Sequence, residues 1–296
     1  MQRSDLGICG RAGYNQPMKN HPPSIAQKLS NWLVPLAALV MIATWLYIAP
    51  PGILGKADAL GYAVCHRLDE RSFHVDGREL PLCARCSGMY LGAVLGIAFQ
   101  AITARRKGGM PPKIIIAVLV AFFLAFALDG ANSYFFLMKS TYGGRLDFIS
   151  TIYLPNNTLR LFTGSGAGLA IAVALYPSFS QTIWRDWDPR PALPGLKPLA
   201  ALIGLMLALD LLVLPEWDWV LYPAALISAG GVLLLLTMVY AMLWMIFMRQ
   251  ENEFMALREA WLPLLAGLTI ALIQITAIDL FRLWLTHTWG GFPLGQ

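Results

Sequence analysis

Three cysteines and two histidines cluster between residues 65 and 86 of this chain: Cys65, His66, His74, Cys83 and Cys86. Thiolate and imidazole groups at this density are typical of a tetrahedral zinc site or of a redox-active thiol centre. The cluster lies between two apolar stretches of a chain that is otherwise rich in hydrophobic residues. The sequence therefore indicates where chemistry is concentrated, although it does not identify a substrate.

The zinc interpretation selects Cys65, His74, Cys83 and Cys86 as ligands. Cys83 and Cys86 form a chelating Cys-x-x-Cys pair, and the other two ligands precede it. His66 adjoins Cys65, and neighbouring residues rarely both reach one tetrahedral ion, so we treat it as an alternative ligand or a supporting group. A closed set of four ligands would be structural, whereas an exchangeable fourth position would leave room for an activated water.

The redox interpretation uses the same atoms. Cys83 and Cys86 would form a redox pair with Cys65 as exchange partner, an arrangement that loosely resembles quinone-linked thiol oxidases of membranes. Quinone would then be the cofactor. A third interpretation is a plain disulfide from Cys65 to Cys83 or Cys86, which would only close the loop.

The segment between the cysteines predicts a short β-hairpin over residues 73–80. Asp76-Gly77 suits the two positive-φ positions of a type I′ turn, which places His74 opposite Glu79. Cys83 and Cys86 then begin the next helix, where the positive end of the helix dipole and Arg85 favour thiolates.

The rest of the chain predicts an all-α integral membrane protein. Hydrophobic residues make up 57% of the chain and charged residues 13%, against about 25% charged in soluble domains. About seven stretches are long enough to cross a bilayer. They are residues 32–50, 84–103, 113–138, 158–180, 198–214, 219–248 and 260–286.

Basic residues predict the orientation of the bundle. Arg105, Arg106 and Lys107 give the strongest signal for a cytoplasmic loop, which places the N-terminus in the cytoplasm and loop 51–86 on the exoplasmic side. Residues 1–30 read as a disordered basic tail, and 31–296 as one multi-pass domain of a plasma membrane. The net charge of +5 is explained by this bias, so we expect no nucleic-acid partner.

Several polar residues fall in or beside the apolar stretches, where charge is costly. With the orientation above they share the outer leaflet, which predicts an outward-facing polar cavity formed by Asp129, Asn132, Asn157, Arg160, Asp279 and Arg282. We expect Arg160 to pair with Asp129, and Asp279 with Arg282. The plainer alternatives are that Asp279 and Arg282 form a surface pair and that Asn157 only caps its helix.

Glycines recur every fourth residue in two of the predicted spans. Gly88, Gly92 and Gly96 form a small-residue stripe on one span, and Gly164 and Gly168 form another. Such stripes allow helices to approach closely, so we expect these two helices to pack together and to bring Cys86 near Arg160.

The run from Cys65 to Gly92 resembles an uncharacterised family of prokaryotic predicted membrane proteins, domain of unknown function 2085. Asp129-Gly130 and the stretch from Pro155 to Gly164 are also similar to that family. The resemblance covers roughly residues 60–180 and implies a prokaryotic membrane protein, but it implies no activity.

The sequence leaves three functions open. The first is a zinc protein, either a structural accessory subunit of a membrane complex or a metal-dependent enzyme on an anionic or lipid substrate, with His66, Asp129 and Arg160 as candidate catalytic residues. The second is a thiol–disulfide oxidoreductase. The third is a transporter or flippase, which is disfavoured because charges are absent from the inner halves of the spans.

Overall fold

A computed structural model describes residues 25–142 and 150–290 of the 296-residue chain. Seven of its helices are long and apolar enough to span a membrane, which confirms the predicted all-α membrane fold. They are α1 (Ile25–Ile48), α3 (Ala84–Thr103), α4 (Lys113–Tyr142), α5 (Asn157–Ile183), α6 (Leu196–Val213), α7 (Asp218–Phe247) and α8 (Trp261–Thr286).

The remaining elements are short and lie at the two ends of the bundle. At one end are helix α2 (Ile53–Val64), the 3-10 turn η1 (Asp69–Arg71) and strands β1 (His74–Val75) and β2 (Arg78–Glu79). We call this the cysteine end. At the opposite end, β3 (Lys107–Gly109) pairs in parallel with β4 (Asp188–Pro191).

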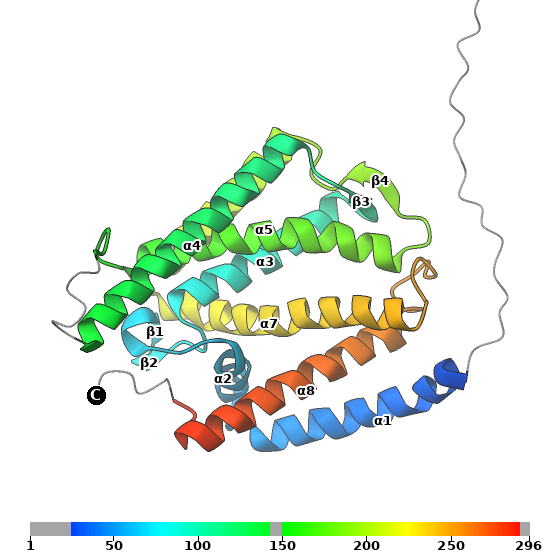
Figure 1. Ribbon diagram of the computed structural model, residues 1–296, viewed down its shortest axis with the longest axis horizontal. Helices are drawn as coiled ribbons and strands as arrows, with labels where there is room; N and C mark the ends of the chain where they lie inside the picture. Colours follow the sequence, from blue (N-terminus) through cyan, green and yellow to red (C-terminus); the bar gives the residue numbers. More distant parts are fainter. Residues whose placement is uncertain (1–24, 143–149, 291–296) are drawn as a thin grey trace, which may run out of the picture.

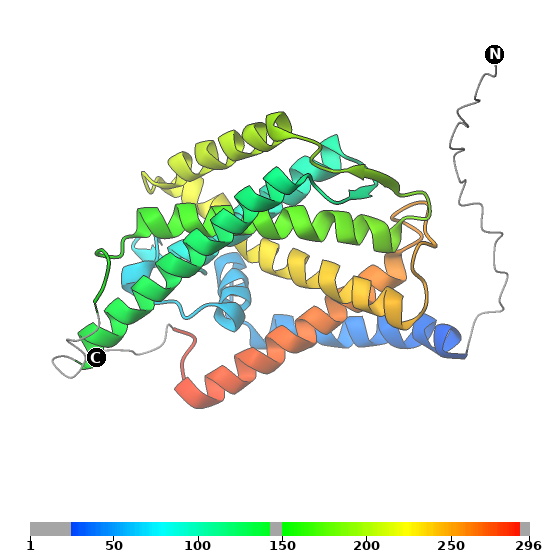
Figure 2. The same cartoon turned by 45° about the horizontal axis from the view of Figure 1, so that its top comes forward.

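The helices are arranged around a central pair, α3 and α5 (Figure 1). Helix α4 packs on α5, α7 packs on α3, and α8 joins α7 to the outermost helix α1. Helix α6 lies against α5 on the side away from α8, as the turned view shows (Figure 2). The outward faces of the long helices carry exposed Leu, Ile, Val, Phe and Trp side chains, as a surface in contact with lipid requires.

Glycine explains the close contact of α3 with α5. A Cβ added at Gly164 would lie 2.2 Å from the carbonyl oxygen of Arg85, and one at Gly168 would lie 2.0 Å from that of Met89. Gly88 and Gly92 approach the backbone of α5 in the same way. The predicted packing of these two helices is confirmed, and it sets their N-terminal ends side by side at the cysteine end.

The hairpin forms as the sequence predicts. His74 pairs with Glu79 and Val75 with Arg78, while Asp76 and Gly77 adopt positive φ angles of 49° and 72°. Val75 and Leu80 are buried beneath the hairpin, so it packs onto the bundle instead of standing in solvent.

The first membrane helix begins earlier than the sequence predicts. Helix α1 begins at Ile25, inside the stretch 1–30 that the sequence assigns to a tail, and residues 1–24 lie outside the described part of the chain. The segment Ile25–Ser30 extends the helix because alanine, glutamine, lysine and leucine in it are all good helix formers.

Candidate metal centre

The structure brings two cysteines and one histidine together at the cysteine end. The ligand atoms of Cys65, His66 and Cys83 all lie within 4.8 Å of one another. Cys86 packs against this group, and its thiol interacts with those of Cys65 and Cys83. Two sulfurs and one imidazole therefore converge with a third sulfur beside them, and these are donor types that suit a tetrahedral zinc ion.

Two chain segments build this cluster. Helix α2 ends at Val64, and Cys65 follows in extended conformation with φ −130° and ψ 144°. Helix α3 begins immediately after Cys83, so Cys86 lies in its first turn. Cys65 and Cys83 are buried, at 6% and 4% exposure, which shields the sulfurs from water and oxidants.

Backbone amides support the Cys65 sulfur. Its Sγ atom accepts hydrogen bonds from the N–H of Cys83 at 3.3 Å and from the N–H of Arg67 at 3.5 Å. Arg67 has a positive φ of 50°, so the chain turns sharply after His66 and directs this N–H back at the sulfur. Hydrogen bonds donated to sulfur stabilise a thiolate, the form in which cysteine binds metal.

The pKa of Cys83 agrees with this description. Hydrogen bonds from Cys65, and then from Cys86, lower the pKa of the Cys83 thiol well below its ordinary value, against the opposing effect of burial. Arg85 adds a smaller electrostatic contribution in the same direction.

Arg282 fixes the backbone that carries the first two ligands. Its guanidinium, on membrane helix α8, donates to the carbonyl oxygens of Tyr62 and Cys65 and, at 3.2 Å, to that of His66. The last carbonyls of a helix have no partners within the helix, and a cation there also complements the helix dipole. Arg282 thus caps α2 and holds Cys65 and His66 in position.

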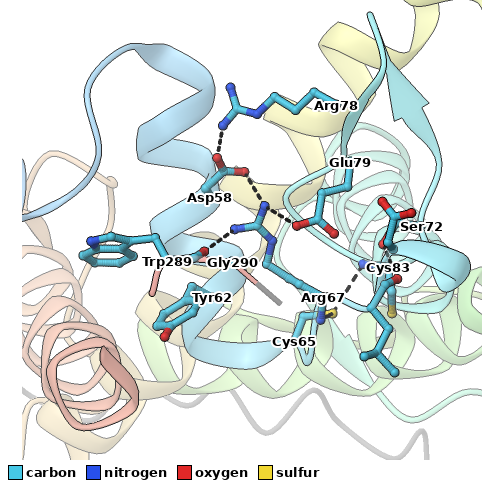
Figure 3. Close-up of polar contacts among 12 residues, drawn as sticks. Asp58, Tyr62, Cys65, Arg67, Ser72, Arg78, Glu79, Cys83, Trp289 and Gly290 are labelled. Carbon is cyan, nitrogen blue, oxygen red and sulfur yellow. Dashed lines mark hydrogen bonds and ion pairs between the residues drawn. The ribbon is translucent and has the colours of Figure 1, made fainter. Parts of the chain in front are cut away.

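A buried ion network lies beside the centre. The guanidinium of Arg67 reaches Asp58 on α2 at 3.2 Å and Glu79 on the hairpin at 3.0 Å, and it donates to the carbonyl oxygen of Trp289 (Figure 3). Arg78 also pairs with Asp58. Burial raises the pKa of Asp58 and of Glu79, while the charge of Arg67 opposes that rise. The network ties α2, the hairpin and the end of α8 together.

His74 lies elsewhere than the sequence prediction placed it. Its Nε2 atom is 2.9 Å from Oδ1 of Asp69 on the exposed side of the hairpin, and His66 supplies the imidazole next to Cys65 and Cys83. The reason is the hairpin register, which directs the partly exposed His74 toward Asp69 while the buried Val75 faces the bundle. The alternative ligand of the sequence analysis, His66, is the one that the fold brings to the cysteines.

Four of the six residues predicted to line a polar cavity form one cluster beside the centre. Asp129 pairs with Arg85 and also accepts hydrogen bonds from Tyr153 at 2.6 Å and Thr163 at 3.3 Å. Asn132 holds the backbone of Ile152 and Tyr153. Asn157 donates to the carbonyl oxygens of Glu70 and Ser72, and Arg160 donates to Asn157 at 2.8 Å.

The other two residues, Asp279 and Arg282, lie on α8 against α2, on the other side of the cysteine loop. The six residues thus form two groups instead of one cavity. The predicted Asp129–Arg160 pair is wrong, because the first turn of α3 brings Arg85 to Asp129 first. The helix cap is Asn156, whose side chain accepts from Leu159, and not Asn157.

Two apolar cavities border the centre. One, of about 290 Å³, is lined by Cys65 and His66 together with Phe281 and Leu285 of α8. The other, of about 460 Å³, lies between α5 and α7 and is lined by Tyr90, which packs against the cysteines. Phe281 and Leu285 are exposed on the outer face of the bundle, so the first cavity opens toward lipid.

Comparison with known proteins identifies relatives of this chain. Residues 65–174 match a family described as predicted membrane protein, DUF2085. An uncharacterised protein of Methanothermobacter thermautotrophicus is 32% identical over 110 residues, which cover 37% of this chain and 82% of that protein. The chain belongs to this family. An uncharacterised protein of Methanocaldococcus jannaschii is 29% identical over 127 residues, which cover 42% of this chain and 69% of the relative.

No solved structure matches this chain. The segment shared with the family begins at Cys65, so it contains all four residues of the cluster and also Asp129 and Arg160. Arg282 and Asp58 lie outside it. The capping role of Arg282 does not follow from the sequence, because the carbonyl groups of Tyr62, Cys65 and His66 that it contacts lie more than 200 residues away.

Proposed function

We propose that this membrane protein binds one zinc ion through Cys65, His66, Cys83 and Cys86. The observation that supports this proposal is the group formed by Cys65, His66 and Cys83, whose ligand atoms lie within 4.8 Å of one another, with Cys86 packed against it. Sulfur and imidazole are the donors that structural zinc prefers, and four of them complete its tetrahedral shell.

The role of the ion is structural in this proposal. Four protein ligands leave no open position for water or substrate, and the cysteines are buried. The ion would join the end of α2 to the start of α3, two segments that meet across the 18 residues from Cys65 to Cys83. Such a rigid end of the bundle suits an accessory subunit that presents the hairpin to other subunits of a membrane complex.

A thiol–disulfide oxidoreductase is the second candidate, and the lipid-facing cavity lined by Cys65 and His66 favours it. A membrane quinone would reach Cys65 through this cavity. Two thiols, Cys83 and Cys86, would lose two electrons and two protons to form a disulfide, and the quinone would gain both to become a quinol. The described cysteines are free thiols, so the pair would be in its reduced form.

Metal content measured on detergent-purified protein tests the first proposal. We expect about one zinc per chain, and loss of most of it in Cys83→Ser, Cys86→Ser and His66→Ala. The matched control is His74→Ala, which removes an imidazole from the same loop and should keep its zinc. If His74→Ala loses zinc while His66→Ala retains it, the ligand assignment is wrong.

A free-thiol count on the same preparation separates the two candidates. Zinc with three protected but unoxidised thiols supports the metal centre. No metal, together with a Cys83–Cys86 disulfide that is reduced and reformed upon cycling with a soluble quinone, would reject the zinc proposal and establish the redox candidate.

A further inference from the structure

Three arginines from three different elements converge beside the cysteine centre. They are Arg71 of the turn η1, Arg85 in the first turn of α3 and Arg160 in the first turn of α5. Arg71 and Arg85 both reach Ser133 of α4, through its carbonyl oxygen at 3.2 Å and its hydroxyl at 2.9 Å. The charge of each guanidinium acts on the others, so the three lie within electrostatic range.

The buried carboxylate charge beside these arginines is smaller than their total positive charge. Within the described part of the chain, Asp129 is the buried carboxylate that contacts this arginine cluster. Arg85 donates two hydrogen bonds to it, from Nε and Nη2. Tyr153 and Thr163 fill its remaining acceptor positions. Glu70 also acts on Arg71, but it is exposed to solvent. Asp129 therefore balances one of the three charges.

Arg160 retains unused hydrogen-bonding capacity. It is 5% exposed, its Nη1 donates to Asn157, and its buried Nε has no hydrogen-bond partner among the residues that the structure describes. Asn157 in turn holds the backbone of Glu70 and Ser72, on both sides of Arg71. Asn157 thus links the Arg160 guanidinium to the backbone on both sides of Arg71. A buried guanidinium donor without an acceptor is costly, so this arrangement indicates a missing acceptor.

The helix ends add to the positive potential. Helices α3 and α5 both begin here and run side by side, as their glycine contacts show. Each helix N-terminus carries a partial positive charge, so two helix dipoles and an excess of guanidinium groups act on the same point. The thiolates of the neighbouring centre offset part of this charge, but a Cys3His centre loaded with zinc carries only one net negative charge.

We propose that Arg71 and Arg160 bind a phosphoryl oxyanion at the junction of α3, α4 and α5. Arg85 pairs with Asp129, so in this proposal it does not bind the anion directly. Guanidinium groups recognise phosphate oxygens through paired N–H donors, which matches the unfilled Nε of Arg160. The phosphoryl group can belong to a phospholipid headgroup at the membrane surface or to free phosphate. This site does not use the zinc ligands, and it goes beyond the proposed structural zinc.

The test is thermal unfolding of the full chain in detergent, with phosphatidylglycerol, phosphatidylcholine or inorganic phosphate added. We expect phosphatidylglycerol to raise the midpoint of the wild-type chain by several degrees. Arg160→Gln and Arg71→Gln should bind it at least ten-fold more weakly. Arg185→Gln, which removes an exposed arginine at the opposite end, is the control for non-specific attraction and should respond like the wild type.

The variants also separate binding from a merely structural role. Without added anion, Arg160→Gln should be at least as stable as the wild-type chain, because it relieves repulsion among the arginines, and its zinc content should be unchanged. A structural arginine would instead leave the variant less stable with or without the anion. Arg160→Lys keeps the charge but loses Nε, and we expect it to fold and to bind more weakly.

The probes distinguish the source of the phosphoryl group. A response to phosphatidylglycerol and to inorganic phosphate supports a site for phosphoryl groups in general, and a response to phosphatidylglycerol alone assigns the site to lipid headgroups. Equal responses of the wild type, Arg160→Gln and Arg71→Gln, or no response of the wild type to either anion, would overturn the proposal even if zinc is found.

Discussion

At the scale of single residues, charged groups at the cysteine end act on the backbone and on each other more than on solvent. Arg282 caps the carbonyls of α2, and Arg67 joins Asp58 to Glu79 in a setting that is largely closed to water. The geometry of the candidate centre therefore depends on residues outside its ligand set. Removal of such supporting groups commonly weakens metal binding by about 10- to 100-fold.

Glu79 provides a pH-dependent test of this network. Burial raises its pKa above the ordinary value of 4.5, although Arg67 opposes the shift. A carboxyl group with a raised pKa binds its proton more tightly in the folded chain, so its contribution to stability is greatest below pH 4.5 and is lost as the pH rises through the raised pKa. Glutamine does not titrate, so it does not lose this contribution. We therefore expect the thermal midpoint of Glu79→Gln minus that of the wild type to increase as the pH rises through that interval.

The measurement is thermal unfolding in detergent at a series of pH values from 4 to 8. Taking the difference between the two chains removes the contribution of zinc binding, which changes with pH in both. Glu70→Gln, at an exposed position on the same loop, is the control. A difference that falls with increasing pH would show that the attraction of Arg67 outweighs burial at Glu79.

At the scale of elements, the contact between α3 and α5 determines where the functional groups meet. Glycines let the two backbones touch, so the first turns of both helices arrive at the same level as the loop from α2. Cys83, Arg85 and Arg160 all belong to these helix starts. Any change that separates the two helices should disturb the metal centre and the arginine cluster together.

Gly168→Ala tests this contact. The added Cβ would lie 2.0 Å from the carbonyl oxygen of Met89, a backbone atom that cannot move aside alone. We expect a loss of about 1–3 kcal/mol in the free energy of unfolding, as for other overpacked contacts.

Gly230→Ala on α7 is the matched control, because nothing lies within 4 Å of its added Cβ. It should raise the free energy of unfolding by up to about 1 kcal/mol, because alanine favours a helix more than glycine does. Unfolding of both variants in increasing denaturant gives the comparison, and equal effects at the two positions would show that α3 and α5 are not held by their glycines.

At the scale of the whole molecule, the bundle has two unlike ends. The cysteine end holds the buried ion network and the ligand cluster, while the opposite end carries Arg106, which pairs with Asp186 and stacks on Trp184. The loop at that opposite end carries the consecutive basic residues Arg105, Arg106 and Lys107. By the positive-inside rule we expect the opposite end in the cytoplasm and the cysteine end outside.

Labelling in intact cells tests this orientation. In a chain with Cys9→Ser, we expect Glu70→Cys to react with a membrane-impermeant maleimide and Glu251→Cys to react only after the cells are opened. Both positions are exposed, one at each end of the bundle. Reaction of Glu251→Cys alone in intact cells would place the cysteine end in the cytoplasm.

The sequence by itself determined the membrane fold, the hairpin and the packing of α3 with α5. These features follow from local or periodic signals: apolar stretches of bilayer length, Asp76-Gly77 in a turn, and glycine at every fourth position. It also placed Cys83 and Cys86 at a helix start, since Cys-x-x-Cys followed by an apolar stretch is a local pattern.

Only the tertiary structure decided which partners these residues meet. The choice of His66 over His74 depends on the path of the chain after α2, which Arg282, more than 200 residues away, holds in place. The pairing of Asp129 with Arg85 instead of Arg160 depends on how the starts of α3 and α5 are set against α4. Such contacts join positions far apart in the chain, and no local pattern encodes the distance between them.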